Sequence, residues 1–114
     1  MLDLNNRRVF LSLGFTDMRK SINTLSILVE NELEGDLFSG DLFGFCNRGQ
    51  DNIKLLWWDR NGFCLFQKRL EKDHFRWPTC PEEAMEITPR QLEWLLEGLD
   101  LEQAHQRLEY SQAT

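Results

Sequence analysis

Cysteine and histidine are both scarce in this chain of 114 residues. The three cysteines are Cys46, Cys64 and Cys80, an odd number without close paired spacing, which argues against a disulfide framework. We therefore expect reduced thiols in a cytoplasmic protein, with Cys46 and Cys64 in the core. Because His74 and His105 have no cysteine or histidine partner at zinc-ligand spacing, neither a metal nor a cofactor is predicted.

Long apolar runs are also missing. No stretch approaches the roughly 20 apolar residues that a membrane span requires. The short run after Arg8 is interrupted at Thr16 and Asp17, and no small-residue cleavage site follows, so no signal peptide is expected. The sequence thus predicts a cytoplasmic protein that makes no contact with a membrane.

A strong excess of positive charge is absent as well, since the formal net charge is −6. The negative charge is concentrated in residues 80–114, which carry two Lys or Arg against eight Asp or Glu. Residues 43–79 carry seven basic and four acidic side chains and are therefore locally positive. Because binding to phosphate depends on many cations releasing counterions, any direct contact with nucleic acid should be local and weak on its own.

The chain has the length of one domain, which we place at residues 1–102, followed by a polar tail over 103–114. Short apolar segments predict strands over 8–14, 42–46, 52–58, 63–70 and 74–77. Apolar residues at helical spacing predict one helix that begins at Thr16 or Asp17 and ends near Gly35. Thr88 and Gln91 form a capping box for a second helix, which Gly98 ends or weakens.

These elements predict an α+β fold. Short connections between successive strands favour an antiparallel meander of about five strands, with one helix after the first strand and one near the C-terminus. In the segment 52–58, alternate residues are apolar on both faces of the strand. One face should bury the core, while the other should meet a helix, a partner or a second copy of the chain.

The segment from Ile53 to Leu70 has the pattern of a β-hairpin. Its turn is the sequence Asp59-Arg60-Asn61-Gly62, and Asn-Gly is a strong hairpin signal because both residues can take a positive φ. This hairpin carries aromatic and cationic residues: Trp57, Trp58, Arg60, Lys68 and Arg69. Single-stranded nucleic acid stacks on such aromatic side chains, whereas arginine can equally stack on tryptophan within the protein. The two tryptophans point to opposite faces, so only one of them is expected to be an exposed platform.

A second candidate surface is the segment Thr16-Asp17-Met18-Arg19-Lys20. Two cations in the first turn of a helix could hold a phosphate or a carboxylate. The alternative is a capped helix start whose cations are solvated or paired with Asp17. A carboxylate cluster that holds Mg²⁺ is the enzymatic possibility, but the aspartates of this chain lie mostly at predicted turns, where they favour local hydrogen bonds.

Five segments together resemble a known family: GFTDMRKS (14–21), DLFSGDLFGF (36–45), IKLLWWDRNGFCLFQKRLE (53–71), FRWP (75–78) and ITPRQLEWLLEGLD (87–100). They resemble the small accessory protein of the TnpB type, which is the product of the second reading frame beside the transposase in a widespread class of bacterial insertion sequences. The chain departs from the usual pattern at Ser21, where glycine is common, and in the turn 46–50, which is less basic than usual.

The resemblance implies a bacterial mobile-element protein without established chemistry of its own. We therefore expect a non-enzymatic accessory factor for DNA transposition that acts with the transposase of the same element, with element DNA, or with both. The alternatives are a metal-dependent nuclease-like helper that uses Asp17 and Asp59, and a homo-oligomeric scaffold. The resemblance and the hairpin pattern together give the candidate binding residues, which are Asp17, Arg19, Lys20, Trp57, Trp58, Asp59, Arg60, Lys68 and Arg69.

The arrangement of the cations distinguishes two kinds of partner. If Arg19, Lys20, Lys68 and Arg69 form one exposed patch, direct binding of nucleic acid is favoured. If they are scattered and engaged in other interactions, a protein partner is the better interpretation.

Overall fold

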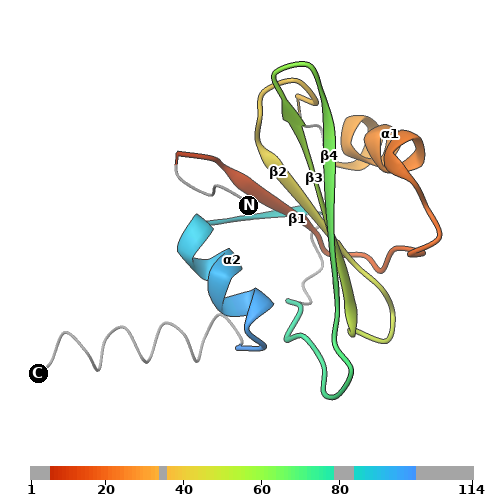
Figure 1. Ribbon diagram of the computed structural model, residues 1–114, viewed down its shortest axis with the longest axis vertical. Helices are drawn as coiled ribbons and strands as arrows, with labels where there is room; N and C mark the ends of the chain where they lie inside the picture. The colour runs from red at the N-terminus through yellow and green to blue at the C-terminus, as the bar shows by residue number, and fades with distance from the viewer. Residues whose placement is uncertain (1–5, 34–35, 79–83, 100–114) are drawn as a thin grey trace, which may run out of the picture.

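A five-stranded mixed sheet lies between two helices in the computed structural model of the protein, which describes residues 6–33, 36–78 and 84–99 (Figure 1). The elements in chain order are β1 (Val9–Ser12), α1 (Ile22–Glu32), β2 (Leu42–Cys46), β3 (Asn52–Asp59), β4 (Gly62–Arg69), β5 (Ala84–Ile87) and α2 (Pro89–Leu96). The predicted α+β class, with five strands and two helices, is confirmed.

The predicted antiparallel meander is wrong, because the order of strands in the sheet is β4-β3-β2-β1-β5 and β1 pairs with β2 in parallel. The physical reason is the helix between these two strands. A parallel pair requires a long crossover connection, and α1 with its flanking loops supplies it. The pairs β2–β3, β3–β4 and β1–β5 are antiparallel. The last strand therefore pairs with the first and forms an edge of the sheet.

The predicted fifth strand over residues 74–77 is also wrong, since these residues pair with no strand in the described part of the chain. They enter the core instead. Phe75 and Trp77 are buried, and the indole Nε1 of Trp77 donates a hydrogen bond to the carbonyl of Ser12 (2.9 Å). Apolar alternation thus identified buried residues correctly, but the side chains pack over the sheet from a loop.

Both faces of the sheet are buried, each under its own helix. On one face, Ile53 and Leu55 of β3 lie in a core cluster with Leu92 and Leu95 of α2. On the other, residues of β2 and β3 pack with α1 in a second cluster of Leu25, Val29, Leu33, Leu37, Phe43, Phe45 and Leu56. The predicted second apolar face therefore meets a helix. Burying each such aliphatic side chain contributes about 1.5–3 kcal/mol to stability.

Helix α1 begins later than predicted. Its N-cap is Ser21, whose side chain makes no capping hydrogen bond, rather than Thr16 or Asp17. Thr16 is buried, and its amide donates to the carbonyl of Cys46 (2.8 Å), so this part of the chain is fixed to the end of β2 before the helix starts. The predicted end at Gly35 lies outside the described residues.

Helix α2 begins and ends as predicted. The Thr88 side chain accepts a hydrogen bond from the Gln91 amide, and the Gln91 side chain accepts one from the Thr88 amide, which completes the capping box. At the other end Gly98 has a φ of +89°, and the amides of Gly98 and Leu99 bond to the carbonyls of Leu95 and Trp94. This is the Schellman pattern, which favours glycine at the left-handed position.

Two of the three cysteines lie on strands, as expected. Cys46 is buried in β2, and burial raises the pKa of its thiol to about 12. Cys64 is half-buried in β4, while Cys80 and the predicted tail over 103–114 lie outside the described residues. Among the described helices, none is long and apolar enough to cross a membrane.

Candidate functional site

The predicted hairpin forms, with β3 and β4 paired along their whole length and Asp59 opposite Gly62. The conformation of its turn differs from the expectation. Arg60 takes the positive φ (51°), whereas neither Asn61 nor Gly62 does. The Asn-Gly pair therefore lies one residue after the position that needs a positive φ. Arg60 occupies this left-handed position, which glycine or asparagine would adopt at lower cost.

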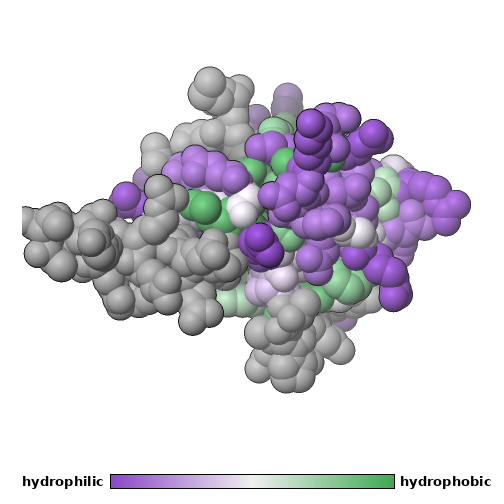
Figure 2. Space-filling model, turned by 90° about the horizontal axis from the view of Figure 1, so that it is seen from below, coloured by the Kyte–Doolittle hydropathy of each residue, from purple (hydrophilic) through white to green (hydrophobic). Residues whose placement is uncertain are grey.

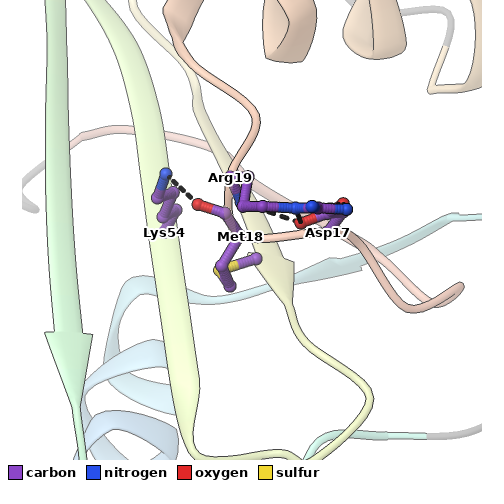
Figure 3. A network of polar contacts seen from close by, with 4 residues as sticks. All are labelled: Asp17, Met18, Arg19 and Lys54. Carbon is purple, nitrogen blue, oxygen red and sulfur yellow. Dashed lines mark hydrogen bonds and ion pairs between the residues drawn. The ribbon is translucent and has the colours of Figure 1, made fainter.

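A buried lysine of the hairpin fixes the loop that precedes α1. Lys54 of β3 is only 7% exposed, and its ammonium group donates hydrogen bonds to the carbonyls of Met18 (2.7 Å) and Lys20 (2.9 Å). Figure 3 shows the lysine side chain reaching from the strand to this loop. Hydrogen bonds from a charged donor are stronger than neutral ones, so two of them hold the loop firmly. The backbone of residues 18–20 is thus attached to the sheet. The Met18 side chain packs against the core cluster under α1, whereas the Arg19 side chain is exposed.

Asp17 and Arg19 form a local ion pair on that loop. The Arg19 guanidinium donates to both carboxylate oxygens of Asp17, with a shortest distance of 2.7 Å between Nη2 and Oδ2. The side-chain hydrogen bonds from Arg19, with a further one from its backbone amide, lower the pKa of Asp17 to about 2. In Figure 3 the pair points away from Lys54. The charge of Arg19, whose side chain is 92% exposed, is therefore already balanced by a neighbour.

This loop lines one side of a groove with a volume of about 690 Å³. Residues 15–19 form that side, residues 47–49 form the other, and Asn52 and Gln67 of the hairpin line it between them. Phe15 is 42% exposed in the groove, with the guanidinium carbon of Arg48 at 5.9 Å from its ring centroid. We refer to this feature as the groove.

The far side of the groove is a rigid turn between β2 and β3. Asn47 organises it, because its side-chain oxygen accepts from the amides of Asp51 and Asn52 and its side-chain nitrogen donates to the Asp51 carboxylate (2.7 Å). The end of the molecule that carries this turn presents mainly hydrophilic side chains, with apolar ones visible between them (Figure 2). The groove therefore combines an exposed aromatic ring and an arginine with a polar surrounding.

A second surface lies at the opposite end of the hairpin, where three aromatic rings meet. Trp58 is in edge contact with Phe38 and with Phe63, with ring centroids 5.0 Å apart in both cases. Phe38, from the loop before β2, is 62% exposed. We call these three residues the aromatic cluster. Two segments of the family resemblance, 36–45 and 53–71, thus meet here.

Of the remaining candidate residues, Trp57 and Lys68 lie on the other face of the sheet, whereas Arg69 lies opposite Asn52, which lines the groove. Trp57 packs against the core cluster under α2, on the other face from Trp58, as the strand alternation predicted. On that same face the ammonium of Lys68 donates to the carbonyl of Leu96 (2.8 Å) at the C-terminal end of α2, where the helix dipole favours a cation. Arg69 is exposed at the end of β4 and makes no hydrogen bond or ion pair with the described residues.

The nine candidate residues therefore do not form one surface. The structure brings Asp17 and Arg19 together beside Lys20, places Trp58, Asp59 and Arg60 at the hairpin tip, and separates Trp57 and Lys68 on the other face. Phe15, Arg48, Lys54, Phe38 and Phe63 were not among the predicted site residues. Their sequence signal was weak, because exposure and tertiary contact decide their roles.

A metal site that joins Asp17 and Asp59 is not supported. Asp59 lies five residues along β3 from Lys54, which contacts the loop of Asp17, and this corresponds to about 16 Å at the rise of a strand. Within residues 6–33, 36–78 and 84–99, no group of three or more His, Cys, Asp or Glu side chains could hold a metal ion.

Comparison with known proteins gives the family. The family described as IS66 Orf2-like protein matches residues 7–106. An uncharacterized protein of Sinorhizobium fredii, y4hO, is 40% identical over 95 residues, which cover 83% of each chain. A second uncharacterized protein of that organism, y4jC, is 31% identical over 93 residues and covers 82% of this chain and 80% of its own. No solved structure matches. The chain therefore belongs to the IS66 Orf2-like family, the small transposition-associated accessory proteins of IS66 insertion sequences.

Proposed function

We propose that this protein is a non-enzymatic accessory factor for DNA transposition that binds the transposase of the same element through the groove. The family membership supports a role in transposition, and the groove supports contact with a protein. The observation that carries the proposal is the exposed Phe15 ring with Arg48 beside it, held between a loop and a turn that are both fixed by hydrogen bonds.

Aromatic and arginine side chains dominate binding energy at protein interfaces, where rigid anchors lose little entropy on binding. Phe15 and Arg48 are such anchors, because the loop of Phe15 is joined to Lys54 and the turn of Arg48 is organised by Asn47. The polar surrounding of the groove suits the rim of an interface.

Direct binding of DNA is less favoured than binding of the transposase. Arg19 is paired with Asp17, and Lys68 is engaged with α2 on the opposite face, so the four cations form no common patch. Arg48 and Arg19 both line the groove, but Asp17 offsets the charge of Arg19, so the groove supplies little of the counterion release that drives DNA affinity. We propose that any DNA contact is secondary to the contact with the transposase.

The nuclease-like alternative finds no support in the described residues. Asp17 forms an ion pair with Arg19, and Asp59 lies at the turn of the hairpin, at the opposite end from the groove. Two-metal hydrolysis needs carboxylates that hold ions about 4 Å apart. We therefore propose that the transposase performs the chemistry and that this chain acts by binding.

The test is co-purification of the full chain with the cognate transposase, followed by titration calorimetry. Arg48→Ala and Phe15→Ala should each weaken binding about tenfold, which corresponds to the loss of about 1.4 kcal/mol at an interface anchor. The matched control is Arg90→Ala, because the Arg90 guanidinium lies over the ring of Trp94 at 5.6 Å in the same kind of arginine–aromatic contact, away from the groove.

Arg90→Ala should leave the affinity unchanged. Absence of any complex between wild-type protein and transposase, or equal losses in all three variants, would contradict the proposal. Fluorescence anisotropy with element-end DNA over a range of salt concentrations forms a parallel experiment. Strong binding that falls steeply with salt and is insensitive to the transposase would make DNA the primary partner instead.

A further inference from the structure

We propose that two copies of this chain associate through the outer edge of β4, so that the two sheets become one continuous antiparallel sheet. The order of strands makes β4 an edge of the sheet, and no described residue pairs with its outer side. Unpaired amide and carbonyl groups along a strand of eight residues form a template for another strand.

The hydrogen-bond pattern shows which residues of β4 face outward. The Leu70 amide donates to the carbonyl of Asp51 (2.8 Å), in register with the β3–β4 pairs, so Leu70 points toward β3. Backbone groups alternate in direction along an antiparallel strand. The amides and carbonyls of Phe63, Leu65, Gln67 and Arg69 therefore point to the open edge.

This edge lacks the protection that natural sheets give to exposed edges. No charged residue occurs between Gly62 and Gln67. Lys68, the first charge, donates to α2 and is therefore not directed along the edge. Charged residues, short length and bulges are the usual means of preventing edge pairing, and β4 has none of them in its first six residues.

The other edge of the sheet differs in these respects. Strand β5 has four residues and carries Glu86, which forms an ion pair with Arg8 at 2.8 Å. A pairing that consumes the β4 edge of both copies leaves only β5 at each end. The assembly then closes as a two-fold dimer and does not grow into a fibre.

The geometry selects a second copy, because β4 is complementary to itself. Residues opposite each other in an antiparallel pair share a face of the sheet, so a two-fold axis must oppose residues of equal parity. If the two-fold axis passes beside Phe66, this residue lies opposite Phe66 of the second copy. Leu65 then lies opposite Gln67 of the second copy, and the paired segment runs from Phe63 to Arg69. No two charges face each other in this register.

The same register gives Arg69 a partner. It lies opposite Phe63 of the second copy, a member of the aromatic cluster, and both side chains are on the α1 face. A guanidinium over an aromatic face is a favourable contact. Because Gln67 on this edge also lines the groove, the aromatic cluster of each copy would extend the groove of the other.

The oligomeric state of the full chain tests this proposal. Light scattering should give twice the mass of one chain for the wild type and the mass of one chain for Gln67→Pro, which lacks the outward amide. Gln67→Thr is the matched control, since it also loses the side-chain bond to Asn52 but keeps the amide, and it should remain a dimer. A wild-type monomer at high concentration, or a Gln67→Pro dimer, would overturn the proposal.

Cysteine cross-linking tests the register even if Gln67→Pro fails to fold. Phe66→Cys opposes itself in a pair with a Cα separation of about 4.5 Å, which a disulfide can span, and should form a covalent dimer with oxidised glutathione. Leu65→Cys is only a diagonal neighbour of itself, beyond the ~7 Å limit, and should not. Cross-linking of Leu65→Cys alone, or of neither variant, would refute the Phe66-centred pairing.

Discussion

The side chains at the loop before α1 have different roles, because one from β3 fixes the loop and two on the loop lie at the surface. Lys54 is buried and bonds to backbone carbonyls, whereas Asp17 and Arg19 satisfy each other in solvent. A salt bridge between exposed groups adds little to stability, because solvent screens it. The Asp17–Arg19 pair therefore affects the charge and shape of the groove more than the stability of the fold.

The first prediction concerns the titration of Asp17. Its folded pKa of about 2 lies below the ordinary value of 3.8, so the small stabilisation from the pair is present above about pH 4 and is lost as the pH falls toward 2. Carboxyl NMR chemical shifts measure this midpoint directly. Arg19→Gln, which removes the largest cause of the shift, should raise the Asp17 midpoint toward 3.8, while the backbone amide of residue 19 and Lys20 keep the pKa somewhat below that value. An unchanged midpoint in that variant would show that the guanidinium does not bind the carboxylate.

The roles of these individual residues could be predicted only in part from the sequence. It singled out Asp17 and Arg19 and offered their mutual pairing as an alternative, which the structure confirms. It placed Lys54 on an apolar strand face without revealing why a charge belongs there. The reason is non-local, because the two acceptor carbonyls lie more than thirty residues earlier in the chain.

Among the elements, β2 shows how one missing side chain permits a tertiary contact. A Cβ at Gly44 would lie 2.8 Å from Cδ2 of Leu11, 3.3 Å from Cδ2 of Leu55 and 3.4 Å from the ring of Trp77. The glycine thus lets the indole lie close to the sheet and reach the Ser12 carbonyl. The loop after β4 is held against the sheet by this contact.

The second prediction is that Gly44→Ala destabilises the protein by about 1–3 kcal/mol, the usual cost of forcing extra volume into a packed core. Urea denaturation measures the free energy of unfolding. Gly14→Ala is the control, because a Cβ there has no atom within 4 Å, and it should be neutral or slightly stabilising. A larger loss for Gly14→Ala than for Gly44→Ala would contradict the role assigned to the close packing.

Elements that depend on local sequence could be predicted, and those that depend on distant partners could not. The hairpin and the capping box of α2 are defined by residues within a few positions of each other, and both form. The choice between residues 74–77 and Ala84–Ile87 as the fifth strand depends on which segment reaches β1. Phe75 and Trp77 are buried over the sheet, and β5 occupies the edge beside β1.

At the scale of the whole molecule, the sheet separates two hydrophobic cores and contributes residues to both. Alternate residues of β2 and β3 contribute to the cluster under α1 and to the cluster under α2. Loss of either helix would expose one complete apolar face. The two cores should therefore unfold together, because neither leaves a stable sheet behind.

The third prediction follows from this coupling. Leu25→Ala under α1 and Leu92→Ala under α2 should each cost about 2–5 kcal/mol and should lower the same single transition. Tryptophan fluorescence and far-UV circular dichroism are expected to coincide in urea titrations of both variants. Since the two sites lie on opposite faces, the double variant should show nearly additive losses if it remains folded. Separate transitions for the two probes would indicate independent units.

The topology of the molecule was the largest error of prediction. Class and element number follow from local periodicity, but the parallel placement of β1 beside β2 requires knowing that α1 crosses the sheet. The candidate site was dispersed for the same reason. Trp57 and Trp58 are adjacent in the sequence, but their side chains point to opposite faces of the sheet. The same is true of Lys68 and Arg69 on β4.

The pairing of β5 with β1 has a consequence for synthesis on the ribosome. Strand β1 cannot pair with β5 until residues 84–87 have been synthesised. Helix α2, which covers one face of the sheet, is synthesised after β5. Until then a nascent chain presents an uncovered layer of aliphatic side chains to chaperones and proteases. Translation stopped before Pro89 should accordingly yield a product that is degraded, because the face that α2 covers stays exposed.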